Sequence, residues 1–239
     1  MKSSCERLMR VAAITCIGLA GSAVAAFAQA PAPVAPQSCT CERGEWHGHV
    51  GHGKDDSFAG GNNEPTAPSP DFANVPGLNF NQQTNVYDQT ASNYHFGDTL
   101  QFNPPPGFTV TKACLTTRLK ANSGDATNDG IDFASHKWPS SGTETGARVA
   151  FAIRSLPGVY PQPWAPAHPP VKFQFTFLPG NMQITGNGTP GAPNPPPNPG
   201  YNGTNFFLAL NANKRLDIYV QDDTSVDFTE LQICARHRP

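Results

Sequence analysis

The segment from residue 171 to residue 177 constrains the fold of this chain more than any other. Its sequence is Val-Lys-Phe-Gln-Phe-Thr-Phe, in which apolar and polar side chains alternate without interruption. Successive side chains of a β-strand point to opposite faces of a sheet, so this pattern predicts a strand with one buried and one solvated face. Val149, Phe151 and Ile153 are likewise expected to point inward with Arg154 outward, and residues 216–221 alternate between apolar and polar side chains. We therefore expect sheets that are buried on one side.

Further strands are predicted where β-branched and aromatic residues cluster between turn-forming residues. These segments are residues 85–96, 99–103, 108–120, 130–135, 182–185, 205–211 and 227–235. No window of a dozen residues shows a helical apolar period free of Gly or Pro, so we predict an all-β fold. Many short strands favour an antiparallel two-sheet β-sandwich that is jelly-roll-like, ahead of an immunoglobulin-like one, with a closed barrel as the alternative.

The first 30 residues have the pattern of a secretory signal peptide. Three basic residues precede an apolar stretch over residues 11–27, which ends in Ala-Gln-Ala. We therefore predict a signal peptide over 1–30, a Pro- and Gly-rich tail or linker over 31–80, and a β-sandwich domain over 81–239. The mature protein is expected to be exported to the periplasm, the cell surface or the medium. No later segment has the roughly 18 consecutive apolar residues of a membrane span.

Charge and motifs limit the function classes. The formal net charge is −2, and charged residues make up 14% of the chain against a typical value of about 25%. Nothing in this composition attracts nucleic acid. The chain has no Gly-x-Ser-x-Gly, no His-Glu-x-x-His and no phosphate-binding glycine loop. A non-catalytic role is therefore favoured, and a hydrolase with its site in loops 157–170 and 178–204 is an alternative.

The cysteines indicate disulfides. Removal of residues 1–30 leaves Cys39, Cys41, Cys114 and Cys234, an even number in an exported chain. Within their predicted strands, Cys114 and Cys234 both lie on the face opposite the apolar one. We expect a Cys114–Cys234 bridge between neighbouring strands. The alternative is that one or both of them pair with Cys39 or Cys41 and fasten the tail to the outer sheet face.

A cluster of soft and borderline metal ligands lies in the predicted tail. It consists of Cys39, Cys41, His47, His49 and His52, with glycines between the histidines. Thiolates and imidazoles are the ligands that zinc and copper prefer. The cluster thus predicts a copper or zinc site, and the alternative is that the cysteines form disulfides while the histidines face solvent.

An acidic turn offers a second metal hypothesis. Asp125 and Asp129 precede a glycine in the way that ligands do in the first half of a calcium loop. The twelfth position holds His136, where an EF-hand needs a bidentate Glu, so an EF-hand is excluded. A calcium site of another type is predicted there, with a polar turn as the alternative.

Four aromatic residues lie beside Pro or Gly in predicted loops. They are Trp138, Tyr160, Trp164 and Tyr201. Flat rings on a sandwich surface can stack on sugar faces, although a ring beside Pro can instead pin a loop to its own domain. We therefore expect a non-catalytic binding or structural module whose partner is a polysaccharide or another surface polymer. A periplasmic or extracellular copper- or zinc-binding protein is the alternative.

Overall fold

A computed structural model of the chain describes residues 39–59, 83–91, 93–135, 148–186, 203–221 and 223–238. All of them belong to one compact unit, Pro36–Pro239. The predicted signal peptide, Trp138 and Tyr201 lie outside the described residues. Within the described ranges, no helix has both the length and the apolar character that crossing a membrane requires.

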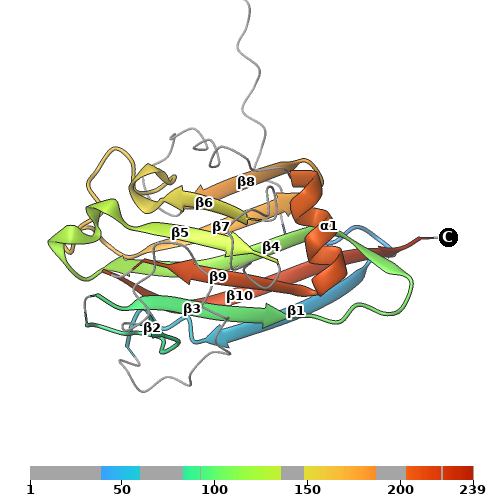
Figure 1. Ribbon diagram of the computed structural model, residues 1–239, viewed down its shortest axis with the longest axis horizontal. Helices are drawn as coiled ribbons and strands as arrows, with labels where there is room; N and C mark the ends of the chain where they lie inside the picture. Colours follow the sequence, from blue (N-terminus) through green and yellow to red (C-terminus); the bar gives the residue numbers. More distant parts are fainter. Residues whose placement is uncertain are drawn as a thin grey trace, which may run out of the picture. The chain divides into compact units, whose positions relative to one another are not determined.

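The described residues form a sandwich of two sheets (Figure 1). The first sheet is antiparallel throughout and has, in spatial order, β1 (Trp46–Gly53), β10 (Thr224–His237), β4 (Phe108–Ala121), β7 (Val171–Leu178) and β8 (Asn181–Gly186). The second has β2 (Gln83–Thr84), β3 (His95–Gln101), β9 (Arg215–Val220), β5 (Gly130–Ala134) and β6 (Arg148–Ala152). Only the two-residue β2 is parallel to its neighbour, β3. The predicted all-β, two-sheet sandwich is confirmed.

The inner faces of both sheets meet in one core. The apolar positions of residues 171–177 are all buried, as their alternation predicts. Phe133 of the second sheet makes edge contacts with Phe175 and Phe177 of the first, at centroid distances of 4.7 and 5.4 Å. Such aromatic pairs stabilise the core beyond the area that they bury.

Residues 205–211 were expected to form a strand, and this prediction is wrong. They belong to helix α1 (Gly203–Asn213), which lies beside β4 and β7 (Figure 1). Phe206, Phe207 and Leu210 are buried at helical spacing, whereas Leu208 is 64% exposed. Phe206 stacks on Phe177 with centroids 5.1 Å apart. A short apolar run does not distinguish a strand from a buried helix, because both place apolar residues inside.

The domain boundary at residue 81 and the strand over 85–96 also need correction. Residues 46–53, predicted to be tail, form the edge strand β1 and pair along their whole length with β10. Of the described residues between 85 and 96, only His95 and Phe96 belong to a strand. Strand β1 carries three glycines and three histidines, which are not strand-forming residues, so its pairing partner rather than its composition makes it a strand.

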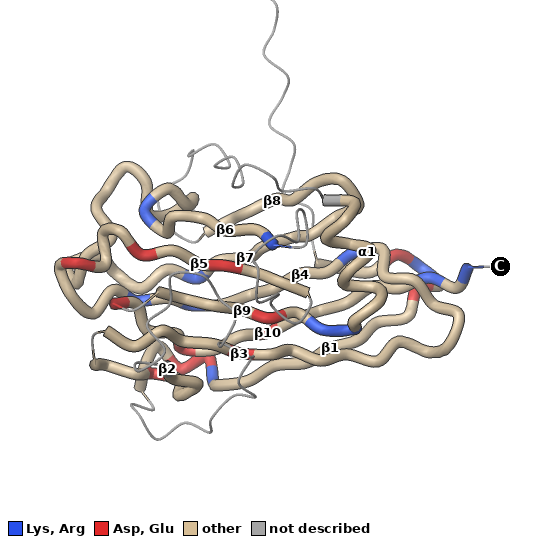
Figure 2. Tube along the Cα trace, in the orientation of Figure 1, with Lys and Arg blue, Asp and Glu red and all other residues tan. Residues whose placement is uncertain are grey.

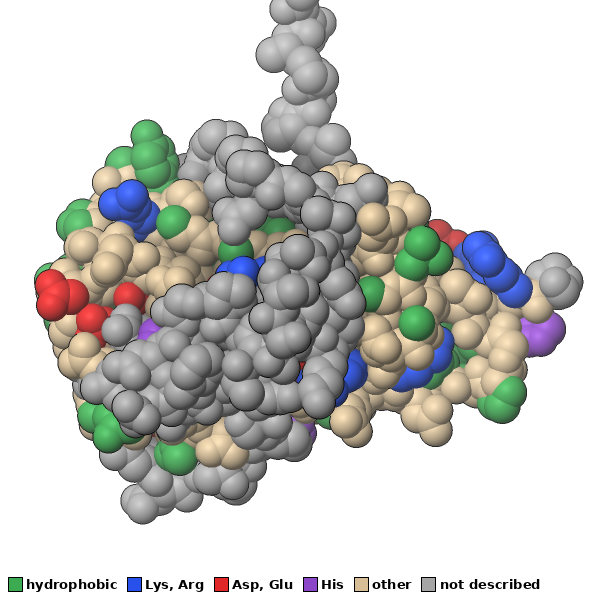
Figure 3. Space-filling model, viewed as in Figure 1, with side chains coloured by type: hydrophobic (Ala, Val, Ile, Leu, Met, Phe, Trp, Pro, Cys, Tyr) green, Lys and Arg blue, Asp and Glu red, His purple; other side chains and the backbone are tan. Residues whose placement is uncertain are grey.

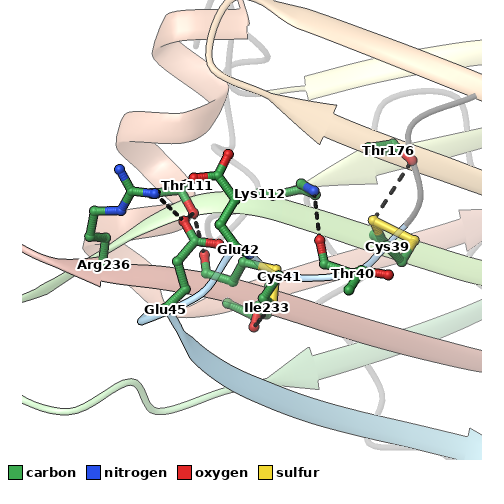
Figure 4. The surroundings of a disulfide bond; sticks show 12 residues. Cys39, Thr40, Cys41, Glu42, Glu45, Thr111, Lys112, Thr176, Ile233 and Arg236 are labelled. Carbon is green, nitrogen blue, oxygen red and sulfur yellow. Dashed lines mark hydrogen bonds and ion pairs between the residues drawn. A yellow bond between two sulfur atoms is a disulfide. The ribbon is translucent and has the colours of Figure 1, made fainter. Parts of the chain in front are cut away.

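The predicted Cys114–Cys234 bridge is wrong, and the alternative pairing is found. Cys39 bonds to Cys114 and Cys41 to Cys234, with Cα–Cα distances of 5.8 and 5.3 Å (Figure 4). The β4–β10 register places Gln232 opposite Cys114, so the two strand cysteines are diagonal neighbours. Diagonal Cα atoms are about 7–8 Å apart, which exceeds the span of a disulfide.

Residues 39–58, which we call the strap, are also held by polar contacts. Lys112 Nζ donates to the carbonyl oxygen of Thr40 over 2.9 Å (Figure 4). Further along, Asp55 forms ion pairs with Arg118 at 2.7 Å and with Lys172 at 2.6 Å. In the coloured part of Figure 2, acidic and basic positions are interspersed over the sheets rather than gathered by sign. Individual hydrogen bonds and ion pairs therefore hold the strap, rather than a long-range electrostatic attraction between surfaces of opposite charge.

Candidate functional site

A pocket of about 530 Å³ lies beside the loop that follows β6. Its lining residues are Thr127, Arg154, Ser155, Tyr160, Pro161, Gln162, Pro163 and Trp164. This volume falls within the range of small-molecule sites, about 300–1,000 Å³. We call it the Tyr160 pocket.

The wall of the pocket that carries Arg154 is a 3-10 turn, η5 (Ile153–Ser155), at the end of β6. The backbone N–H of Ile153 donates to the carbonyl oxygen of Asp129 over 2.9 Å, which ties the turn to the start of β5. Ser155 Oγ donates to the carbonyl oxygen of Ala152 over 2.7 Å. The backbone of Arg154 is thus fixed, while its side chain is exposed.

The other lining segment is a proline-rich turn, Tyr160 to Trp164. The N–H of Tyr160 donates to the carbonyl oxygen of Leu156 over 3.2 Å, and that of Gln162 donates to Val159 over 2.9 Å. Leu156 and Val159 are buried, so they hold the turn on the sandwich. Because the ring of Pro161 restricts its own φ, the chain beside Tyr160 has little backbone freedom.

Tyr160 itself is 55% exposed. Among the described residues, the other exposed large hydrophobic side chains are Tyr94 and Leu208. On the face drawn in Figure 3, hydrophobic side chains that are coloured lie scattered rather than in one broad patch. Tyr160 is therefore one of few large hydrophobic side chains that the described residues expose, and it lines a pocket. A ring in that position offers a flat apolar face and a polar hydroxyl.

Trp164 was predicted to contact a ligand, and the structure corrects this. Its side chain has no exposed surface, although it is among the residues that line the pocket. Trp164 Nε1 donates to Thr224 Oγ1 over 2.8 Å, and its ring lies 5.3 Å from that of His168. A fully buried indole cannot stack on a ligand, so Trp164 anchors the loop and positions the pocket.

Asp129 holds Thr224, the residue that accepts the hydrogen bond from Trp164. It does not form a metal site with Asp125. Its Oδ2 accepts hydrogen bonds from Thr224 Oγ1 at 2.7 Å and from the N–H of Asp223 at 3.1 Å. Asp125 is exposed in the neighbouring turn η4 (Gly124–Asn128). Within the described ranges, neither aspartate belongs to a metal-sized group of three acidic, His or Cys ligands. The calcium hypothesis therefore has no assembled site at Asp125 and Asp129.

The fold does not bring the residues of the predicted copper or zinc site together. Cys39 and Cys41 are oxidised in disulfides, so the prediction that they offer thiolates is wrong for this structure. His47 is exposed on β1. His49 Nε2 pairs with Glu230 Oε1 at 2.6 Å. In the part of the chain that the structure describes, no group of three potential metal ligands with all atoms within 4.8 Å contains a histidine.

His52 lies in a second, smaller hollow of about 240 Å³, which His49, Asp55 and Glu230 also line. Its Nδ1 is 2.9 Å from Oδ1 of the fully buried Asp98. Asp98 also accepts hydrogen bonds from the hydroxyls of Tyr87 and Thr229. The hydrogen bond to Asp98 raises the pKa of His52 above its usual 6.5, against the opposing effect of partial burial. This pair joins edge strand β1 to β3 of the other sheet.

Three carboxylates that the sequence analysis did not connect also meet beside the strap. Asp56, Asp88 and Asp227 place carboxylate oxygens within 4.8 Å of one another. Asp227 accepts hydrogen bonds from the N–H groups of Phe58 at 2.8 Å and Ser57 at 3.2 Å. At least one member of this group therefore serves to hold the end of the strap.

Comparison with known protein families, curated proteins and solved structures found no match to this chain. The Tyr160 pocket is the candidate functional site. Its lining combines an exposed ring, an exposed guanidinium and polar side chains on a fixed backbone.

Proposed function

We propose that this protein is an exported, non-catalytic binding module that holds a polysaccharide chain in the Tyr160 pocket. The observation that carries this proposal is the 55% exposure of the Tyr160 ring beside a pocket whose backbone is fixed. A rigid site binds more tightly, because little conformational freedom is lost when the ligand arrives.

The chemistry of the lining suits a sugar. Pyranose rings present an apolar C–H face, which packs on an aromatic ring, and hydroxyls around their edge. Gln162 supplies an amide donor and acceptor, while Thr127 and Ser155 supply hydroxyl oxygens. One exposed ring flanked by such groups supports stacking with lateral hydrogen bonds.

The lining also supports binding over hydrolysis. The eight residues that line the pocket include no Asp or Glu. Glycoside hydrolysis generally uses two carboxylates across the scissile bond. We therefore propose that the pocket retains the polymer without cleaving it.

Two further observations support export. The first 30 residues have the signal-peptide pattern described above. The cysteine pairs Cys39–Cys114 and Cys41–Cys234 lie at disulfide distance, and disulfides persist in oxidising compartments outside the cytosol. The proposed place of action is the periplasm, the cell surface or the medium.

A depletion assay tests the proposal. Purified protein is mixed with insoluble cellulose, chitin, xylan or bacterial cell wall, and the unbound fraction is measured. We expect retention on at least one polymer and a loss of about tenfold in affinity for Tyr160→Ala, since a stacking ring contributes on the order of 1 kcal/mol or more.

The matched control is Tyr94→Ala, which removes another exposed tyrosine, one that does not line the pocket. It should bind like the wild type. No retention on any polymer, or equal loss for both variants, would contradict the proposed function.

A further inference from the structure

We infer that the polysaccharide bound at the Tyr160 pocket is acidic, and that Arg154 binds the carboxylate of a uronic acid unit. The inference rests on the proposed function, because it names the class of polymer that the same pocket takes. Two observations support it: the charges around the pocket, and the pairing of the arginines that lie in the sheet strands.

Arg154 is the only charged residue among the eight that line the pocket. Its side chain is exposed, and none of the ion pairs between described residues includes it. Arg154 therefore lines the pocket without an ion pair to any carboxylate of the described residues.

The arginines of the sheet strands behave differently. All four are paired with carboxylates: Arg118 with Asp55 and Asp227, Arg148 with Asp132, Arg215 with Asp217, and Arg236 with Glu42. The protein thus neutralises the guanidinium groups of its sheets internally. Arg154, at the pocket, is left available for an external anion.

The guanidinium group suits a carboxylate in particular. Its planar fork donates two parallel hydrogen bonds to the two oxygens of a carboxylate, and such charge-assisted pairs are about twice as strong as neutral ones. Arg154 and Tyr160 both line this pocket. In a uronic acid the carboxylate is attached to the pyranose ring, so one sugar unit can stack on Tyr160 while its carboxylate meets Arg154.

The negative net charge of the chain does not oppose this binding strongly. The formal net charge is only −2, and the acids and bases of the sheets are interspersed (Figure 2). Charges more than a Debye length apart, about 8 Å at physiological salt, are largely screened. The local guanidinium therefore dominates at the pocket, and binding should weaken as salt is added.

Two polymers with the same sugar backbone, one acidic and one esterified, test the inference. Polygalacturonate and its methyl ester have the same sugar backbone, and the ester lacks the negative charge. Affinity electrophoresis in gels that contain either polymer measures both affinities for the whole protein. We expect the wild type to bind polygalacturonate about ten- to a hundredfold more tightly than the ester, the range for a charge-assisted bidentate contact.

Three variants separate the roles of the residues. Arg154→Gln should bind both polymers equally and weakly, whereas Tyr160→Ala should lose affinity for both. Arg43→Gln is the control for net charge, since Arg43 is exposed and lies outside the pocket, and it should behave like the wild type. Dextran sulfate replaces the polyuronate in a further gel, and its retardation of the protein should be weaker.

The outcomes distinguish this inference from the proposed function. If a neutral polymer binds as well as polygalacturonate and Arg154→Gln changes nothing, the inference fails while polysaccharide binding stands. If no polymer retards the protein, both fail. If Arg43→Gln and Arg154→Gln weaken binding equally, or dextran sulfate binds as tightly as polygalacturonate, the attraction is general and the assignment to Arg154 is overturned.

Discussion

The strap and the loop that carries the Tyr160 pocket lie on the same sandwich but are held in different ways. The strap, residues 39–58, is fixed by two disulfides, by pairing with β10 and by ion pairs. The pocket loop, residues 156–168, has neither cysteine nor acid and is fixed by buried side chains, chiefly Trp164.

This difference follows from composition. The apolar residues of β1, Trp46 and Val50, are only partly buried, so the strap gains little from the core. Covalent links then supply the stability that burial cannot. The pocket loop has a large indole to bury, and burial of such a side chain is worth several kcal/mol. We therefore expect reductant and pH to act on the strap, and changes in the core to act on the pocket.

The largest expected effect is loss of both disulfides through Cys39→Ala with Cys41→Ala. The bonded residues are 75 and 193 positions apart, and in the chain-entropy model each such link contributes about 4–5 kcal/mol. We expect the free energy of unfolding in urea to fall by at least about 4 kcal/mol. Hydrogen exchange should show β1 losing protection before residues 156–168 do.

Reductant provides the control for this prediction. It should destabilise the wild type to a similar degree and leave the double variant unchanged. Equal urea midpoints for the oxidised wild type and the variant would show that the strap does not depend on its covalent links.

The next largest effect is expected for Trp164→Ala. Removal of a buried Trp side chain typically costs about 3–5 kcal/mol. Exchange should accelerate in residues 156–168, polymer binding should be lost, and β1 should keep its protection. Trp164→Phe keeps a six-membered aromatic ring but removes the pyrrole part of the indole and its hydrogen bond to Thr224, so it should cost less than Trp164→Ala. Faster exchange in β1 for either variant would refute the independence of the two regions.

The smallest effect concerns pH and the His52–Asp98 pair. Because the pKa of His52 is raised in the folded state, its stabilising contribution is complete below pH 6.5 and is lost as pH rises through the folded-state pKa. We expect the free energy of unfolding in urea to show this loss with rising pH in the wild type. In His52→Gln the loss should be absent. His49→Gln, at the exposed pair with Glu230, is the control and should retain the loss. An identical pH profile for wild type and His52→Gln would contradict the assignment.

The fold was predictable where its signal is local. The alternation in residues 171–177 predicts both the strand and the face that it buries, because a period of two follows from strand geometry. The outward direction of Cys114 follows in the same way. The identity of its partner, Cys39, could not be predicted from the sequence. That pairing depends on the register between β4 and β10, which are distant in sequence. Strand β1 was not predicted because it depends on pairing with β10, which is also distant in sequence.

The site was predictable only in part. Tyr160 and Trp164 are both aromatic residues next to proline, so the sequence supports the same role for each. The turn over residues 156–164 exposes one ring and buries the other, which only the three-dimensional path of the loop determines. The sequence analysis did not name Arg154 as a site residue. A lone arginine at the end of a strand has no distinguishing pattern, and only the structure shows that it lines a pocket and forms no ion pair with the described residues.

Hydrogen exchange of the protein adsorbed on the insoluble polysaccharide that retains it best tests the central claim directly. If the Tyr160 pocket holds the polymer, adsorption slows exchange in residues 153–164 and leaves β1 (residues 46–53) unchanged. Slower exchange in β1, with residues 153–164 unchanged, would place the binding surface on the strap and contradict the account.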